Sequence, residues 1–141
     1  HDQMPRLSRF LLGDWLKTTI KKELAVSDSE QQVSAGYEDR FGCKHTRAIS
    51  LEPNFLTIED IVSGFKQKAV LRFRLIPVDW KLVGSSLVSE FCTINISANI
   101  SIMRIELTTG FESRYYHQES EIPVLEIEVA EPGTLTTEVK F

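Results

Sequence analysis

Glycine, proline and long apolar runs are all scarce in this chain of 141 residues. The 7 glycines and 5 prolines are too few for a disordered or collagen-like protein. No apolar run approaches the roughly 20 residues of a membrane-spanning helix. The first residues also lack the basic, apolar and small-residue order of a signal peptide. We therefore expect a folded, soluble protein with no membrane partner.

Cysteine is equally sparse, because the chain carries only Cys43 and Cys92. One pair is not a disulfide framework, and sequence separation does not reveal whether the two thiols meet in space. A chain of this length buries roughly two thirds of its unfolded surface and needs no covalent staple. We expect two free, partly buried thiols, and the alternative of a single bridge stays open.

Basic residues are too few to suggest a nucleic-acid partner. The formal net charge is −4 and the sequence pI is near 5.4, whereas phosphate binding requires a basic patch. The densest basic region contains Lys66, Lys68, Arg72 and Arg74. Their spacing favours a solvated sheet face, although a groove for sugar acids is the alternative.

Motifs for several enzyme classes are missing. The chain has no glycine-rich phosphate loop, no Gly-x-Ser-x-Gly and no His-Glu-x-x-His. Nucleotide chemistry, serine hydrolysis and metalloprotease chemistry are therefore not expected.

Strict alternation of apolar and polar residues is the strongest structural signal that is present. The alternating runs are separated by turn signals such as Glu131-Pro132-Gly133, which fits hairpins better than alternating strand and helix units. The sequence predicts an all-β, antiparallel two-sheet β-sandwich with residues 1–141 in one domain. The clearest runs are Leu71–Leu75, Ile94–Ser97, Ile100–Ile102 and Leu125–Val129.

Two segments need separate interpretation. Residues 15–25 have apolar positions near helical spacing, but the β-branched run around Thr18 and Thr19 favours a strand. The segment Leu135–Phe141 reads as the last strand. We expect it to lie at a sheet edge or to pair with a partner chain.

The segment from Gly36 to Arg47 contains the densest group of functional side chains. If residues 44–51 are extended, side chains two apart share a face. Cys43, His45 and Arg47 then lie on one face, which gathers an imidazole and a guanidinium.

Short motifs in this segment, Gly36-Tyr37 and His45-Thr46-Arg47, are followed by Leu56–Asp60, Leu71–Pro77, Arg114–His117 and Leu135–Val139. The order of these motifs resembles the C-terminal β-sandwich region of the heparinase II/III-like polysaccharide lyases. The resemblance implies that the chain is a C-terminal fragment of a longer, bacterial, periplasmic or secreted protein. It implies an acidic polysaccharide as substrate, such as a glycosaminoglycan or alginate, and upstream helical and sandwich domains as partners.

The catalytic residues of that family lie outside the matching region. A His-Asn-Thr motif with the sandwich histidine would precede residue 1, and the chain contains no such motif. The resemblance therefore implies no catalytic residue here and no lyase activity for this chain alone, whereas the activity of its parent stays open.

Site residues are implied by the same resemblance, position by position. Tyr37 and Arg47 become candidates for substrate binding, although Tyr37 also suits hairpin packing. His45 becomes a candidate zinc ligand with Asp14 or Asp2, against a simple hydrogen-bonded strand histidine. Because a structural zinc site needs four ligands, we expect no tight zinc binding by this chain even if the full-length parent binds zinc.

Other motifs have plain structural interpretations. Glu59-Asp60 is typical of turn chemistry, although either carboxylate could instead pair with Arg47. Tyr115-Tyr116 is typical of aromatic packing on an edge strand. A second hypothesis makes the chain a carbohydrate-binding or adhesion module that uses exposed aromatics such as Trp80, Tyr115 and Tyr116. A third treats it as a structural interaction domain.

Overall fold

The structure is a computed structural model that describes residues 6–9, 11, 13 and 16–141. Those residues form eleven strands and no helix that could cross a membrane. The strands are β1 (Lys17–Val26), β2 (Gln31–Glu38), β3 (Lys44–Glu52), β4 (Phe55–Ser63), β5 (Ala69–Arg74), β6 (Lys81–Val83), β7 (Ser86–Val88), β8 (Thr93–Ala98), β9 (Ile102–Glu112), β10 (Ser120–Val129) and β11 (Gly133–Lys140).

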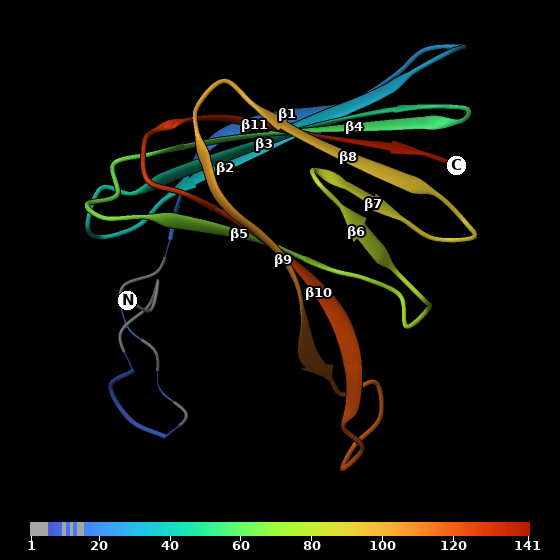
Figure 1. The fold of residues 1–141 in the computed structure, drawn as a ribbon. Coiled ribbons are helices and arrows are strands. Elements are labelled where there is room, and N and C mark those ends of the chain that lie inside the picture. The colour runs from blue at the N-terminus through green and yellow to red at the C-terminus, as the bar shows by residue number, and fades with distance from the viewer. Residues whose placement is uncertain (1–5, 10, 12, 14–15) are drawn as a thin grey trace.

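Two antiparallel sheets pack against each other (Figure 1). The large sheet has eight strands in the order β1-β2-β3-β4-β11-β8-β7-β6, and the small sheet has the order β5-β10-β9. The predicted all-β sandwich is confirmed. The predicted strand over residues 15–25 is confirmed as β1 for the part that begins at Lys17.

Alternation along β10 shows how the sequence builds the core. Leu125, Ile127 and Val129 are at most 1% exposed, while Glu126 and Glu128 between them lie on the opposite face. Because successive side chains of a strand point to opposite faces, one strand contributes both to the core and to a charged surface. The buried core cluster comprises Val62, Leu87, Ile94, Ile96, Leu125, Ile127, Val129 and Leu135.

The last strand lies in the middle of the large sheet, so the expectation of an edge strand or an external partner was wrong. β11 pairs with β4 on one side and with β8 on the other. Leu135 stands opposite both Asp60 and Ala98 and is 1% exposed. Period-two alternation reveals which face of a strand is buried, but it does not reveal the neighbouring strands.

Candidate functional site: a cleft between the two sheets

A cleft of about 650 Å³ opens between the large and the small sheet. One side comes from the hairpin of β2 and β3, and the other from β5 and β10. Its floor is apolar, whereas its rim carries phenol, imidazole, thiol and amine groups. The lining residues include Tyr37, Cys43, Lys44, His45, Phe65, Lys68 and Arg72.

Strand register places the predicted candidates side by side. Tyr37 of β2 pairs with His45 of β3, and their rings meet edge to face at 5.4 Å between centroids. Arg47 lies two residues further along β3, opposite Asp60 of β4. The prediction that His45 and Arg47 share a face is confirmed. Cys43 comes just before β3 and also lines the cleft.

Asp60 is the carboxylate that joins these candidates, as the alternative of a pair with Arg47 allowed. Its side chain is 0% exposed, and it accepts hydrogen bonds from His45 Nε2 at 2.5 Å and from Arg47 Nε at 2.7 Å. Arg47 Nη2 donates to its second oxygen at 3.0 Å. The expectation of a turn was wrong, because Asp60 lies inside β4 and the chain turns only at Gly64.

This buried cluster keeps Asp60 ionised. Burial by itself raises the pKa of Asp60, but hydrogen bonds from His45 and Arg47 and the charge of Arg47 outweigh it, so the pKa lies below its ordinary value. The Arg47 guanidinium also lies over the Phe73 ring at 5.1 Å. Arg47 is therefore held behind the cleft rim, whereas Tyr37 and His45 line the cleft itself.

The hairpin tip beside the cleft is held by local contacts. Asp39 Oδ1 accepts hydrogen bonds from the backbone N–H groups of Phe41 at 2.8 Å and Cys43 at 2.9 Å. Gly64, at φ +76°, packs so closely that an added Cβ would stand 2.0 Å from the carbonyl oxygen of Gly42. Burial, together with the Asp39 carboxylate, raises the pKa of the Cys43 thiol. This side of the cleft is thus closely packed, and its thiol is protonated at neutral pH.

Comparison with solved structures finds the same arrangement of strands elsewhere. A heparinase III gene product superposes with a TM-score of 0.76 at 12% identity, covering 88% of this chain and 21% of that one. A second heparinase III structure superposes with a TM-score of 0.71 at 13% identity, covering 89% of this chain and 21% of that one. The heparan sulfate lyase HepC from Pedobacter heparinus superposes with a TM-score of 0.67 at 12% identity, covering 88% of this chain and 21% of that one.

The chain shares its fold with part of heparinase III. The predicted resemblance to heparinase-like lyases is therefore confirmed at the level of the fold. The chain spans about a fifth of the length of these structures. No family model matches the sequence, and no curated protein matches it.

The described surroundings of His45 do not fit the zinc site that this resemblance implies. Nε2 of His45 and both oxygens of Asp60 are already engaged, and the Arg47 cation is part of the same cluster. Among the residues that the structure describes, no three His, Cys, Asp or Glu side chains gather as a metal site. Asp14 and Asp2 lie outside the described residues, so their pairing with His45 as ligands stays a prediction.

The basic residues near the cleft are matched by carboxylates. Lys68 Nζ lies 2.9 Å from Glu128, Arg72 Nε lies 2.6 Å from Glu126, and Lys44 Nζ lies 3.6 Å from Glu38. These pairs agree with the interpretation of a solvated charged face. The cleft rim therefore offers hydrogen-bonding groups with little excess positive charge.

The conspicuous tyrosines lie elsewhere. Tyr115 and Tyr116 are 70% and 90% exposed in the connection between β9 and β10. The expectation of edge-strand packing was therefore wrong, because the two residues lie beyond the strand ends. Trp80 is half-buried, and its Nε1 donates to the Ile76 carbonyl at 3.0 Å.

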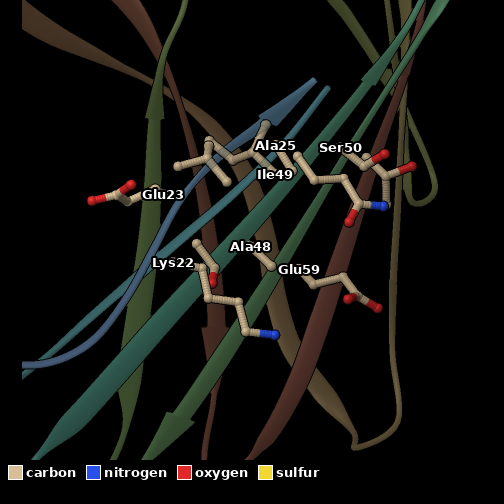
Figure 2. A pocket seen from close by; sticks show the side chains of 11 residues that line it. Lys22, Glu23, Ala25, Ala48, Ile49, Ser50 and Glu59 are labelled. Atoms are coloured by element: carbon tan, nitrogen blue, oxygen red, sulfur yellow. The ribbon is translucent and has the colours of Figure 1, made fainter. Parts of the chain in front are cut away.

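A smaller depression of about 210 Å³ lies over β1, β2, β3 and β4, as Figure 2 shows. The short Ala48 lies between the longer Lys22 and Glu59, and Ser50 also lines the depression. Glu30 accepts hydrogen bonds from Ser50 Oγ and from Gln32 Nε2, which lower the pKa of Glu30. No aromatic side chain is among the described residues that line it.

Proposed function

We propose that this chain is the accessory β-sandwich of a heparinase-like polysaccharide lyase, and that it forms one wall of the cleft that holds an acidic polysaccharide for β-elimination. The observation that carries the proposal is the inter-sheet cleft with Tyr37 and His45 on its rim, in a chain that shares the heparinase III fold. On this proposal the parent is a longer periplasmic or secreted protein whose helical and sandwich domains precede this region.

The chemistry of β-elimination assigns a binding role to these residues. The reaction needs a base, an acid for the leaving oxygen and a group that stabilises charge on the carboxylate. His45 and Arg47 are committed to Asp60, which holds them in place and neutralises part of their charge. Tyr37 lines the cleft, and its side chain combines an aromatic ring with a phenol, a combination that suits contact with a sugar. We assign substrate contact to Tyr37 and support of the cleft wall to the Asp60 cluster.

NMR shift mapping with heparin, heparan sulfate and alginate oligosaccharides tests the proposal. We expect shifts to centre on Tyr37 and His45, which line the cleft, and Tyr37→Ala to weaken binding several-fold. Tyr116→Ala is the matched control, because it removes an equally large but distant, exposed ring. Undiminished binding by the Tyr37 variant, with a fold unchanged by circular dichroism, would contradict the assignment.

An activity assay tests the second half of the proposal. The chain alone should produce no time-dependent rise in unsaturated-uronate absorbance from the same polysaccharides, because acid and base come from other parts of the parent. Any rise that scales with protein concentration and survives repurification would overturn it.

A carbohydrate-binding or adhesion module is the second candidate function, and the exposure of Tyr115 and Tyr116 favours it. Exposed aromatic rings can stack on pyranose faces without a deep cleft. In the same NMR experiment this function predicts shifts around the β9–β10 connection, with Tyr37 unaffected.

A further inference from the structure

The two sheets leave four strand edges, and three of them are poorly suited to pairing with another strand. β1 has register irregularities at two places and carries Lys17 and Lys22. β6 has only three residues, and β5 has six and is followed closely by Pro77. Bulges, lysines, prolines and short length are the usual ways in which proteins block their sheet edges.

The fourth edge, β9, differs from these. It has 11 residues, it contains no lysine or proline, and within the described residues it pairs with β10 alone. Its single irregularity is at Met103, so residues 104–112 run in regular register with β10. Figure 1 shows the β9–β10 hairpin extending away from the large sheet. Phe111 near its end is 55% exposed.

The regular part of β9 is complementary to itself. An antiparallel copy placed about a two-fold axis through Thr108 sets Arg104 opposite Glu112 at both ends, where each contact would add to a pair within the chain, Arg104 with Glu126 and Glu112 with Arg114. Ile105 then stands opposite Phe111, and the two Thr108 side chains face each other. Opposite charges, aromatic with β-branched residues, and threonine pairs are all favourable across strands. An axis through Glu106 would instead set two glutamates against each other.

We propose that β9 pairs with β9 of a second copy of this chain, joining the two small sheets into one continuous six-stranded sheet. We identify the partner as a second copy of this chain because, in the register about Thr108, β9 matches its own charged and apolar residues. Such an isologous contact is closed by its two-fold axis and produces a dimer rather than a fibre. Its area is small, so the dimer is weak and forms at high protein concentration.

Cross-linking at the proposed axis tests the register. Thr108→Cys places the two new thiols on directly opposite residues, whose Cβ atoms lie about 4.5–5.5 Å apart. Glu112→Cys is the control, because its two copies would stand roughly 27 Å apart along the paired strands. With a short bismaleimide we expect Thr108→Cys to yield at least tenfold more dimer than the control. Peptide mapping distinguishes this link from links through the native Cys43 and Cys92.

Sedimentation analysis of the unmodified chain supplies the independent measurement. We expect the mean mass to rise toward twice that of the monomer between low micromolar and near-millimolar protein. Phe111→Lys, an exposed change that spares the monomer fold, should abolish the rise. A monomer at every concentration, or equal cross-linking by the two cysteine variants, overturns the proposal and leaves β9 to a strand from another protein.

Discussion

Two clusters of ion pairs in this protein use the same side-chain chemistry in opposite environments. In the first, Asp60 holds His45 and Arg47 between the sheets with its own side chain 0% exposed. In the second, Arg104 bonds to Glu106 and Glu126 on the outer face of the small sheet. Arg104 is 36% exposed and Glu106 is 55% exposed. Of these side chains, only Asp60 has lost its access to water, because His45 and Arg47 keep 22% and 33% of their exposure.

The difference in burial decides what each cluster contributes. A buried carboxylate has lost its hydration, so its partners are needed to keep it charged. A surface pair exchanges one set of hydrogen bonds for another and is screened by salt. Arg104 sits among carboxylates that raise its pKa, but it is solvated in any case. We therefore expect large effects from the buried cluster and small effects from the surface cluster.

Asp60→Ala should produce the largest effect. It leaves the Arg47 guanidinium half-buried without its carboxylate, and loss of one partner from a buried pair costs about 3–5 kcal/mol. Urea unfolding measures the change in the free energy of unfolding. As a control, a triple variant with Asp60→Leu, His45→Leu and Arg47→Met should recover much of the loss. If the free energy of unfolding of Asp60→Ala lies within about 1 kcal/mol of that of the unmodified chain, Asp60 contributes no more than a surface ion pair.

Acid should weaken the buried cluster selectively. Because the pKa of Asp60 is lower in the folded state than in the unfolded chain, its stabilising contribution is complete above the unfolded value. That contribution is lost as the pH falls through the folded value. Thermal unfolding followed by circular dichroism from neutral to acidic pH should show this loss. Asp60→Asn should flatten the acid limb, and an unchanged limb would contradict the assignment.

Thr137→Val tests the effect of a buried polar group that, unlike Asp60, has no hydrogen-bond partner among the described residues. Thr137 is 2% exposed, and its hydroxyl oxygen has no hydrogen-bond partner among the described residues. An unsatisfied buried hydroxyl is unfavourable, so replacing it with a methyl group of similar shape should stabilise the fold by about 1 kcal/mol. Urea unfolding measures the gain. Ser97→Val, at an exposed position of β8, is the control and should change stability little.

Glu126→Gln should have the smallest effect. It removes the carboxylate shared by Arg72 and Arg104, whose hydrogen bonds lower the pKa of Glu126. Since surface pairs contribute about 1 kcal/mol or less, we expect a shift in that range that shrinks in high salt. A loss that is as large as that of Asp60→Ala, and insensitive to salt, would remove the contrast between the clusters.

The candidate site was only partly predictable from sequence. The shared face of His45 and Arg47 followed from strand alternation, and β3 confirms it. The sequence offered Glu59 or Asp60 as a partner for Arg47 but could not choose between them, and an acidic pair before Ser63-Gly64 is also typical of a turn. Asp60 meets His45 and Arg47 because of the register in which β3 pairs with β4. A shift of one residue would turn the Asp60 side chain to the other face of the sheet. The exposure of Tyr115 and Tyr116 likewise depended on where β9 ends.

By itself, the sequence determined the all-β fold class of this protein, because strands with period-two alternation can bury their apolar face only when they form packed sheets. It also determined which side chains of each strand face inward. The tertiary structure alone decided that the last strand lies between β4 and β8 and that one carboxylate joins an imidazole and a guanidinium. The physical reason is that alternation is a local property of each strand. Strand order and register depend instead on contacts between segments far apart in the chain.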